Sequence, residues 1–264
     1  MSIGYTKEDL KEQLRKIGFS GNDAVMVHSS MKALGNVEGG ADTVVDAFIE
    51  FFSKGMFMTP THTWKQMSEE YAVFDPKNEP ACVGIIPNVF MKKEGVVRSL
   101  HPTHSIAAIG KGAEEYVKGE ENASTPCPVG GCWDRLREID AKILLIGVTH
   151  ARNTFIHAVE EVFDVPERLT EKPATFSILM PDGSEKKVEM YRHYNSTTDH
   201  ISESFDKMLE GYFETGVAKK VKLGDAECIL CDAKGIFEVT GRILQKEKNC
   251  FIERENIPRE WYLV

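Results

Sequence analysis

The segment from Lys142 to Phe163 constrains the fold more than any other part of the chain. It begins with a short apolar run at 143–146, typical of a strand buried on both faces of a sheet. The spacing then changes to the three- and four-residue steps of a helix with one apolar stripe, at Phe155, Ile156, Val159 and Phe163. The segment therefore predicts a strand, a tight loop and a helix. In open α/β sheets this junction is where ligands bind.

Polar side chains lie at this predicted junction. Asn153 stands where a helix N-cap is expected, because its side chain can accept from a free backbone amide. His157 follows one turn into the helix, and Glu160 and Glu161 come three and four residues later on the same side. A carboxylate so placed holds one imidazole nitrogen and leaves the other free to act as a base. The alternative is a core histidine beside two solvated glutamates, and the spacing alone does not decide.

Two earlier segments have a similar pattern of strand followed by polar residues. A strand at 24–27 leads into His28-Ser29-Ser30-Met31-Lys32 and a helix from about Ala41, and a strand at 56–58 leads into residues 59–64, which include His62. Further along, 174–180 and 186–194 flank a Pro-Asp-Gly turn and predict a hairpin. Residues 65–84 and 112–132 are expected to be loops. We therefore expect an α/β fold with a mixed central sheet flanked by helices, as a single domain over 1–264.

The chemistry of the strand ends leaves alternatives open. The hydroxyls and backbone amides at residues 28–32 suit a phosphate, but Ser-Ser is equally a turn signal. His101 and His104, with other histidines, could hold a metal, yet Pro102 excludes the helical spacing of a HExxH site. Cys228 and Cys231 form a lone CxxC without the second pair of a structural zinc site. We therefore expect no metal.

Charge and hydropathy restrict the partners and the compartment. The net charge is −9, from 41 acidic and 32 basic residues, which argues against nucleic acid or an anionic membrane and is compatible with a cationic ligand. No apolar run approaches the ~20 residues that a membrane span needs. The N-terminal residues become charged too early for a signal peptide. We expect a cytoplasmic protein whose six cysteines are thiols.

A resemblance to a known family is carried by four stretches in chain order: VHSSMKALGNVEGGADTVVDAF, MTPTHTW, GVVRSLHPTHSIAAIGKGAEE and LLIGVTHARNTFIHAVEE. They resemble the aminoglycoside 3-N-acetyltransferases, a family of antibiotic N-acetyltransferases, and the likeness extends from about residue 6 to 240. The resemblance implies the α/β fold of that family and acetyl-CoA as the donor. It also implies the 3-amino group of a 2-deoxystreptamine antibiotic as the acceptor.

The resemblance also implies roles for particular residues. His157 matches the proposed base, Glu160 the carboxylate that orients it, and His28 a second histidine of the site. Contacts with the acceptor are expected from Asn153 and His150. The stretches expected to meet acetyl-CoA contain Ser29, Ser30, Met31, Lys32, Arg98 and Ser99.

These residues together predict direct attack of an amine on the thioester in a ternary complex, with no enzyme nucleophile. The acceptor is expected to be a cationic amine, drawn in by glutamates near the predicted rim: Glu114, Glu115, Glu120, Glu121, Glu160 and Glu161. The protein is expected to be a monomer or a homodimer. Two alternatives from other classes are a non-catalytic CoA-binding protein on the same fold and a metal-dependent hydrolase built on the histidines.

Overall fold

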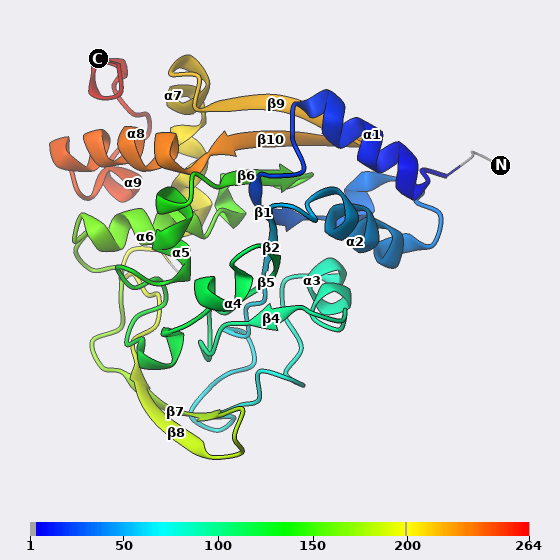
Figure 1. The fold of residues 1–264 in the computed structure, drawn as a ribbon. Helices are drawn as coiled ribbons and strands as arrows, with labels where there is room; N and C mark the ends of the chain where they lie inside the picture. Colours follow the sequence, from blue (N-terminus) through cyan, green and yellow to red (C-terminus); the bar gives the residue numbers. More distant parts are fainter. Residues whose placement is uncertain (1–3, 199, 264) are drawn as a thin grey trace.

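A computed structural model describes residues 4–198 and 200–263 of the chain. Its largest element is a seven-stranded sheet with the order β4-β5-β2-β1-β6-β10-β9, and a second sheet has the order β3-β7-β8 (Figure 1). The strands are β1 (Ala24–Ser29), β2 (Met56–Pro60), β3 (Val73–Phe74), β4 (Val97–Arg98), β5 (Ile106–Gly110), β6 (Lys142–Ile146), β7 (Ala174–Leu179), β8 (Glu185–Met190), β9 (Ala218–Leu223) and β10 (Ala226–Asp232).

Short helices connect and cover these strands. The α-helices are α1 (Lys7–Ile17), α2 (Gly40–Phe51), α3 (Ile85–Phe90), α4 (Ala113–Tyr116), α5 (Cys132–Glu138), α6 (Phe155–Val162), α7 (Leu209–Glu214), α8 (Ala233–Lys246) and α9 (Cys250–Glu253). The 3-10 helices are η1 (Met31–Leu34), η2 (Glu120–Asn122), η3 (His150–Arg152), η4 (Ile201–Met208) and η5 (Arg259–Trp261).

The large sheet is mixed, as the sequence predicted. The central strand β1 runs parallel to β2 and to β6, whereas β5, β4, β10 and β9 each run antiparallel to an inner neighbour. The chain therefore leaves β1 toward β2 on one side and later returns as β6 on the other. A reversal of this kind opens a crevice at the carboxyl ends of the parallel strands.

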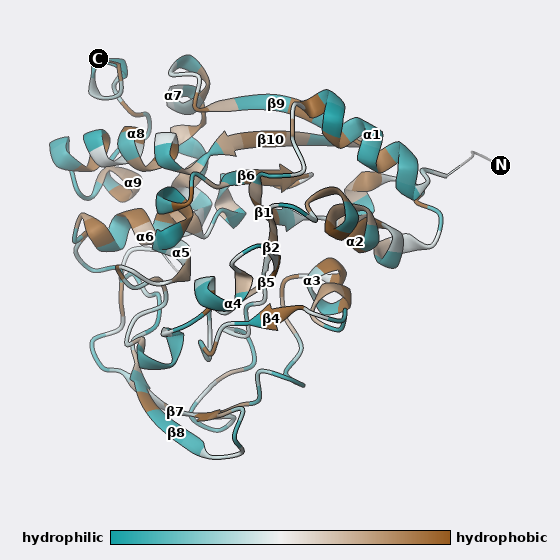
Figure 2. Cartoon of the chain, viewed as in Figure 1, coloured by the Kyte–Doolittle hydropathy of each residue, from teal (hydrophilic) through white to brown (hydrophobic). Residues whose placement is uncertain are grey.

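The apolar run of β6 contributes to two separate cores. Ile143 and Leu145 pack in a cluster with residues of α5, α6 and α8, whereas Leu144 and Ile146 pack in a cluster with α1, α2 and α3. This alternation follows from the two-residue period of a strand. Both faces of the sheet are consequently covered by helices, and Figure 2 shows hydrophobic residues along the inner strands and in several of these helices. The continuous apolar run is thus explained by burial on both faces.

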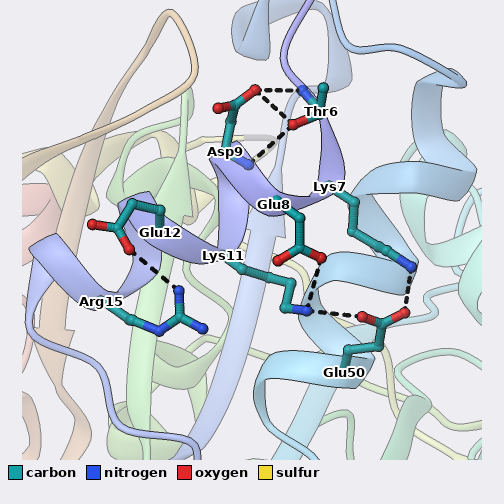
Figure 3. A network of polar contacts seen from close by, with 8 residues as sticks. All are labelled: Thr6, Lys7, Glu8, Asp9, Lys11, Glu12, Arg15 and Glu50. Carbon is teal, nitrogen blue, oxygen red and sulfur yellow. Dashed lines mark hydrogen bonds and ion pairs between the residues drawn. The ribbon is translucent and has the colours of Figure 1, made fainter.

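The first helix has an N-terminal capping box. The Thr6 hydroxyl accepts from the Asp9 amide at 3.2 Å, and the Asp9 carboxylate accepts from the Thr6 amide at 2.9 Å. Glu50 on α2 forms ion pairs with both Lys7 and Lys11 of α1, and these pairs connect the two helices at the surface (Figure 3). Such exposed pairs add little stability compared with the apolar contacts beneath them.

The second sheet corrects one sequence prediction. The predicted hairpin is confirmed as β7 and β8, paired antiparallel from Ala174↔Met190 to Leu179↔Glu185. Residues 65–84 were expected to be a loop, but they contain β3, which pairs parallel with β7. Because β3 has only two residues, its alternation is too short to detect. This sheet has its own apolar cluster and lies beyond β4 at the bottom of Figure 1.

One further segment differs from the sequence predictions. Residues 112–132, expected to be a loop, include α4 and η2. Across residues 4–198 and 200–263, no helix combines the length and apolar character that a membrane span requires.

Candidate active site

A cavity of about 780 Å³ opens at the carboxyl ends of the three parallel strands. His28 and Ser29 from β1, Pro60 from β2, His62 just after it and Val148 beyond β6 line its floor. Residues from the start of α6, from the segment after β8 and from the start of η4 complete the lining. Its volume is within the range of small-molecule sites. The cavity therefore lies at the strand–loop–helix junction that the sequence singled out.

Imidazole rings form one side of this cavity. We call the histidines that line it within the described residues, apart from the exposed His200, the histidine wall: His28, His62, His104, His157 and His193. The ring centroids of His157 and His193 are 3.9 Å apart, those of His193 and His104 5.0 Å, and those of His104 and His62 4.7 Å. Trp133 lies behind and contacts both His62 and His28, at 5.4 and 5.8 Å. Ring contacts therefore run in an almost unbroken series from His157 to His28.

Burial keeps this wall uncharged at neutral pH. It lowers the pKa of His28 to about 3, with a smaller contribution from His150. It also lowers the pKa of His62, His104 and His193 well below 6.5, and neighbouring histidines add to that shift. Each ring then has one donor and one acceptor nitrogen. The Nε2 of His28 and the Nδ1 of His62 are buried and have no hydrogen-bond partner within the described residues.

His157 and Glu160 form a direct pair beneath the cavity. The spacing of three residues on α6 brings the Nδ1 of His157 within 2.7 Å of the Oε2 of Glu160. Glu160 is completely buried, whereas the His157 side chain reaches the cavity. Glu161 turns elsewhere, accepting from the Thr125 hydroxyl and pairing with Arg168 at 2.5 Å. The expectation of two solvated glutamates on this helix is therefore wrong, because Glu160 is buried against His157 and Glu161 is paired with Arg168.

Protonation of this pair decides what His157 can do. Burial raises the pKa of Glu160 to about 8, against the opposing effect of Arg168. Burial also lowers the pKa of His157 to about 3, and Arg168 adds to that shift. When Glu160 is ionised, Nδ1–H donates to it and Nε2 has a free lone pair. When Glu160 holds the proton, Nδ1 accepts and Nε2 carries the hydrogen, so only the ionised carboxylate leaves a base.

Asn153 lines the cavity, but it is not the cap of α6. The turn η3 intervenes, capped by the Thr149 hydroxyl, and the N-cap position of α6 is Thr154 without a side-chain cap bond. The Asn153 amide instead contacts the Nδ1 of His150 at 3.2 Å, while its Oδ1 has no partner within the described residues. His150 is fully buried and does not line the cavity. Only Asn153 of this pair is therefore placed to meet a ligand.

Of the four residues after His28 that were expected to meet acetyl-CoA, only Ser29 lines the cavity. Ser30 donates its amide to the carbonyl of Ile146, and Met31 and Lys32 begin the turn η1. The strand end thus places its first hydroxyl in the crevice, while the following residues continue into the turn.

Arg98 and Ser99, which were expected to meet acetyl-CoA, make hydrogen bonds within the fold. Arg98 donates to the carbonyls of Thr61 at 2.7 Å and Glu79 at 2.6 Å, which joins β4 to two loops. Ser99 is completely buried, and its hydroxyl accepts from the Ile106 amide at 3.0 Å. Neither residue lines the cavity. Their polar atoms are used by the fold itself.

The expected acidic rim is also wrong for the described residues. The charged side chains on the cavity lining there are Lys65, Arg152, Arg192 and Glu203, and Arg152 pairs with Glu203 at 3.0 Å. None of the six glutamates that were expected to attract a cation lines it. Glu120, for example, is buried and accepts from the amide of Cys132 at the start of α5. Residues 112–132 pack against α5 and do not cover the cavity.

The side chains with metal-binding chemistry do not converge. Across residues 4–198 and 200–263, no three His, Cys, Asp or Glu residues form a group that could hold a metal ion. Cys228 and Cys231 lie on β10 and point into the two cores on opposite faces of the sheet. A three-residue step along a strand always separates two side chains in this way.

Sequence reasoning missed His193. It follows β8 and no strand-end pattern marks it, yet an isolated bridge to Leu169 brings it to the face of His157. Thr154 was also missed; its hydroxyl lies 3.0 Å from the Nε2 of His62. Both contacts join segments far apart in sequence, so no local spacing could reveal them.

Comparisons with known proteins find one family and the same fold. The model of the aminoglycoside 3-N-acetyltransferase family matches residues 26–245. An aminoglycoside N(3)-acetyltransferase III from Salmonella is 25% identical over 268 residues, covering 92% of each chain. A histidine-to-alanine mutant of aminoglycoside acetyltransferase AAC(3)-IVa, solved with a gentamicin, superposes with a TM-score of 0.82 at 25% identity, covering 98% of this chain and 94% of that one. AAC-IIIb with CoASH gives 0.81 at 21% identity, covering 92% and 97%.

Proposed function

Because the chain belongs to the aminoglycoside 3-N-acetyltransferase family, we propose that it transfers the acetyl group of acetyl-CoA to the 3-amino group of a 2-deoxystreptamine aminoglycoside or a similar cationic amine. Residues 1–264 would act as one acetyltransferase domain, since the cavity takes its lining from His28 through to Glu203. The observation that carries the proposal is the buried pair of His157 and Glu160, with His157 open to the cavity.

The pair supplies the proton acceptor that the reaction needs. An ammonium has no lone pair, so the acceptor must lose a proton before or while it attacks. The Nε2 of His157 makes no hydrogen bond within the described residues and takes that proton, while ionised Glu160 stabilises the imidazolium from 2.7 Å away. The acceptor nitrogen bonds to the acetyl carbon and the carbon–sulfur bond breaks. Of the two protons that the ammonium nitrogen loses, one passes through His157 to the departing thiolate and the other is released to solvent, so the products are the amide, CoA thiol and a proton.

The lining supports a role for the cavity in binding both substrates. Lys65, Arg152 and Arg192 provide cations for the phosphates of acetyl-CoA, and Ser29 adds a hydroxyl at the end of β1. The solved AAC-IIIb relative binds CoASH, which agrees with this assignment. His28 and Asn153 offer unpartnered polar atoms to the acceptor. The acceptor class rests on family membership and on relatives solved with gentamicin, apramycin or sisomicin, and not on the charge of the lining.

Thiol release tests this function. With acetyl-CoA and gentamicin, apramycin or sisomicin, we expect release of CoA thiol that depends on the acceptor, and a drug product heavier by one acetyl group. A drug already acetylated on its 3-amino group is the matched control and should release none. Thiol release with amines of other classes only would contradict the acceptor class. Failure of CoA to bind in calorimetry at millimolar concentration would remove the acetyltransferase proposal.

A further inference from the structure

The ring of His193 covers one face of the His157 imidazole. The two rings are stacked, with centroids 3.9 Å apart and an angle of 24° between their planes. Phe205 of η4 meets the same imidazole edge-on, at 4.8 Å and 65°. Neither ring nitrogen of His193 makes a hydrogen bond of good geometry within the described residues, and burial lowers the pKa of this ring against the smaller, opposing effect of a weaker contact with the Arg168 backbone. His193 therefore contacts His157 through the flat face of its ring.

A flat neighbour matters because the hydrogen bond to Glu160 does not fix the plane of the His157 ring. The hydrogen bond holds only one nitrogen, and the second side-chain torsion of histidine has a broad energy well. Coupled changes in both side-chain torsions would tilt the ring about the line of this hydrogen bond, which displaces Nε2 from a substrate while Nδ1 stays near the carboxylate. His193, which stacks on one face of the His157 ring, and Phe205, which meets that ring edge-on, both oppose this movement. A base that is misplaced by about 1 Å can lose about 10²-fold in rate.

His193 is itself firmly held. The amide of Tyr194 donates to the Arg168 carbonyl at 3.1 Å, and the amide of Thr170 donates to the Arg192 carbonyl at 2.9 Å. The Arg192 guanidinium donates to the Met67 carbonyl at 3.0 Å. The backbone on both sides of His193 is thus attached to residues 168–170, and the Arg192 side chain attaches it to a second segment. The ring reaches His157 from a separate part of the chain and can resist movement of α6.

On the basis of the function proposed above, we infer that His193 is a positioning residue, which holds the His157 ring in the orientation that pairs with Glu160 and shields that ring from water. It does so through its face and not through its nitrogens. The ionisable groups around His157 come from four directions: Glu160 on α6, Arg168 after it, His193, and His62 with His104 across the wall. Of these, only His193 stacks on the ring.

Two substitutions separate the face from the nitrogens. His193→Phe keeps a flat ring and removes both nitrogens, whereas His193→Ala removes the ring. We expect His193→Ala to lower kcat at least ~10-fold with little change in KM for acetyl-CoA, and His193→Phe to stay within about threefold of wild type. In His193→Ala, water reaches His157, so its pKa should rise toward 6.5 and its NMR titration should begin at a pH where the protein is still folded, whereas the wild-type ring should stay neutral down to the pH of unfolding. If His193→Ala does not fold, His193→Leu tests the loss of the flat ring at similar volume.

Several results would overturn this inference. A folded His193→Ala with the kcat and the His157 pKa of wild type would show that the stack has no role. Equal losses in His193→Phe and His193→Ala would assign the role to the nitrogens. A fall in kcat that matches only a fall in Tm, with the His157 pKa unmoved, would make His193 merely structural. The NMR titration needs no turnover, so it still tests the stack if thiol release shows that the proposed function is wrong.

Discussion

Replacing His157 by alanine should lower kcat by at least ~10²-fold, because the proton of the acceptor then has no positioned base. The binding of acetyl-CoA should change little, since the imidazole is assigned to the acceptor's proton. Removing the side chain also leaves Glu160 buried without its partner at 2.7 Å, so the fold must be checked by circular dichroism and Tm. Initial rates at saturating substrates then give kcat directly.

A matched control is available in the same cavity. His200→Ala removes an exposed imidazole from the lining and should cost far less, because His200 is not paired with a buried carboxylate. If folded His157→Ala turned over at the wild-type rate, His157 would be a core histidine and the proposed base would be wrong. Loss of acetyl-CoA affinity equal to the loss of kcat would instead place the imidazole at the donor.

The second large effect is on stability in mild acid. Burial lowers the pKa of seven of the eight histidines: His28, His62, His101, His104, His150, His157 and His193. Below pH 6.5 the unfolded chain protonates these groups, while the folded chain does not until much lower pH. The stability they provide is therefore complete above about pH 6.5 and is lost as the pH falls toward about 3 for His157.

The magnitude follows from the proton difference. Each histidine that is charged only in the unfolded chain removes about 1.4 kcal/mol for each pH unit. Four histidines that stay neutral in the folded chain would together remove about 5–6 kcal/mol of stability for each pH unit. The free energy of unfolding of a protein is typically about 5–15 kcal/mol in total. Glu160 acts in the opposite sense, because its raised pKa costs stability as the pH rises from 4.5 to about 8, but it is one group against several. We expect unfolding between roughly pH 5 and 6.

Denaturant titrations at pH 5.0, 5.5, 6.0, 6.5 and 7.0 would measure this slope. His200→Ala, which removes an exposed histidine, should leave the slope unchanged. A free energy of unfolding that is flat between pH 5 and 6.5 would mean that the wall is hydrated and takes up protons in the folded state. The conclusion that the histidine wall stays uncharged in the folded protein would then be wrong.

Local pattern predicted the fold well wherever one segment carried the whole signal. The apolar run at Ile143 and the helical spacing from Phe155 predicted β6 and α6, and the Thr6 capping box and the β7–β8 hairpin are also local. The pair of His157 and Glu160 follows from a three-residue step on one helix. Elements whose geometry depends only on near neighbours in sequence are visible without the fold.

Features made by contacts between distant segments were missed or misassigned. Arg98 was expected to meet acetyl-CoA, but it is used by loop carbonyls that the sequence does not place beside it. Glu120 was expected at the rim and is instead buried against α5. His193 reaches His157 through a bridge to Leu169 after an unrelated hairpin. Charge and polarity in a sequence do not say which group the fold itself will satisfy.

The pH dependence of kcat in wild type and in Glu160→Gln is the most direct measurement of the central claim, that His157 is a base only while Glu160 is ionised. Burial raises the pKa of Glu160 to about 8, so wild-type kcat should rise about tenfold for each pH unit and level off above that value. Glutamine cannot ionise and accepts from Nδ1–H at every pH, so Glu160→Gln should lose this rise. A rise due to the acceptor amine would persist in both proteins. Identical pH profiles would contradict the account.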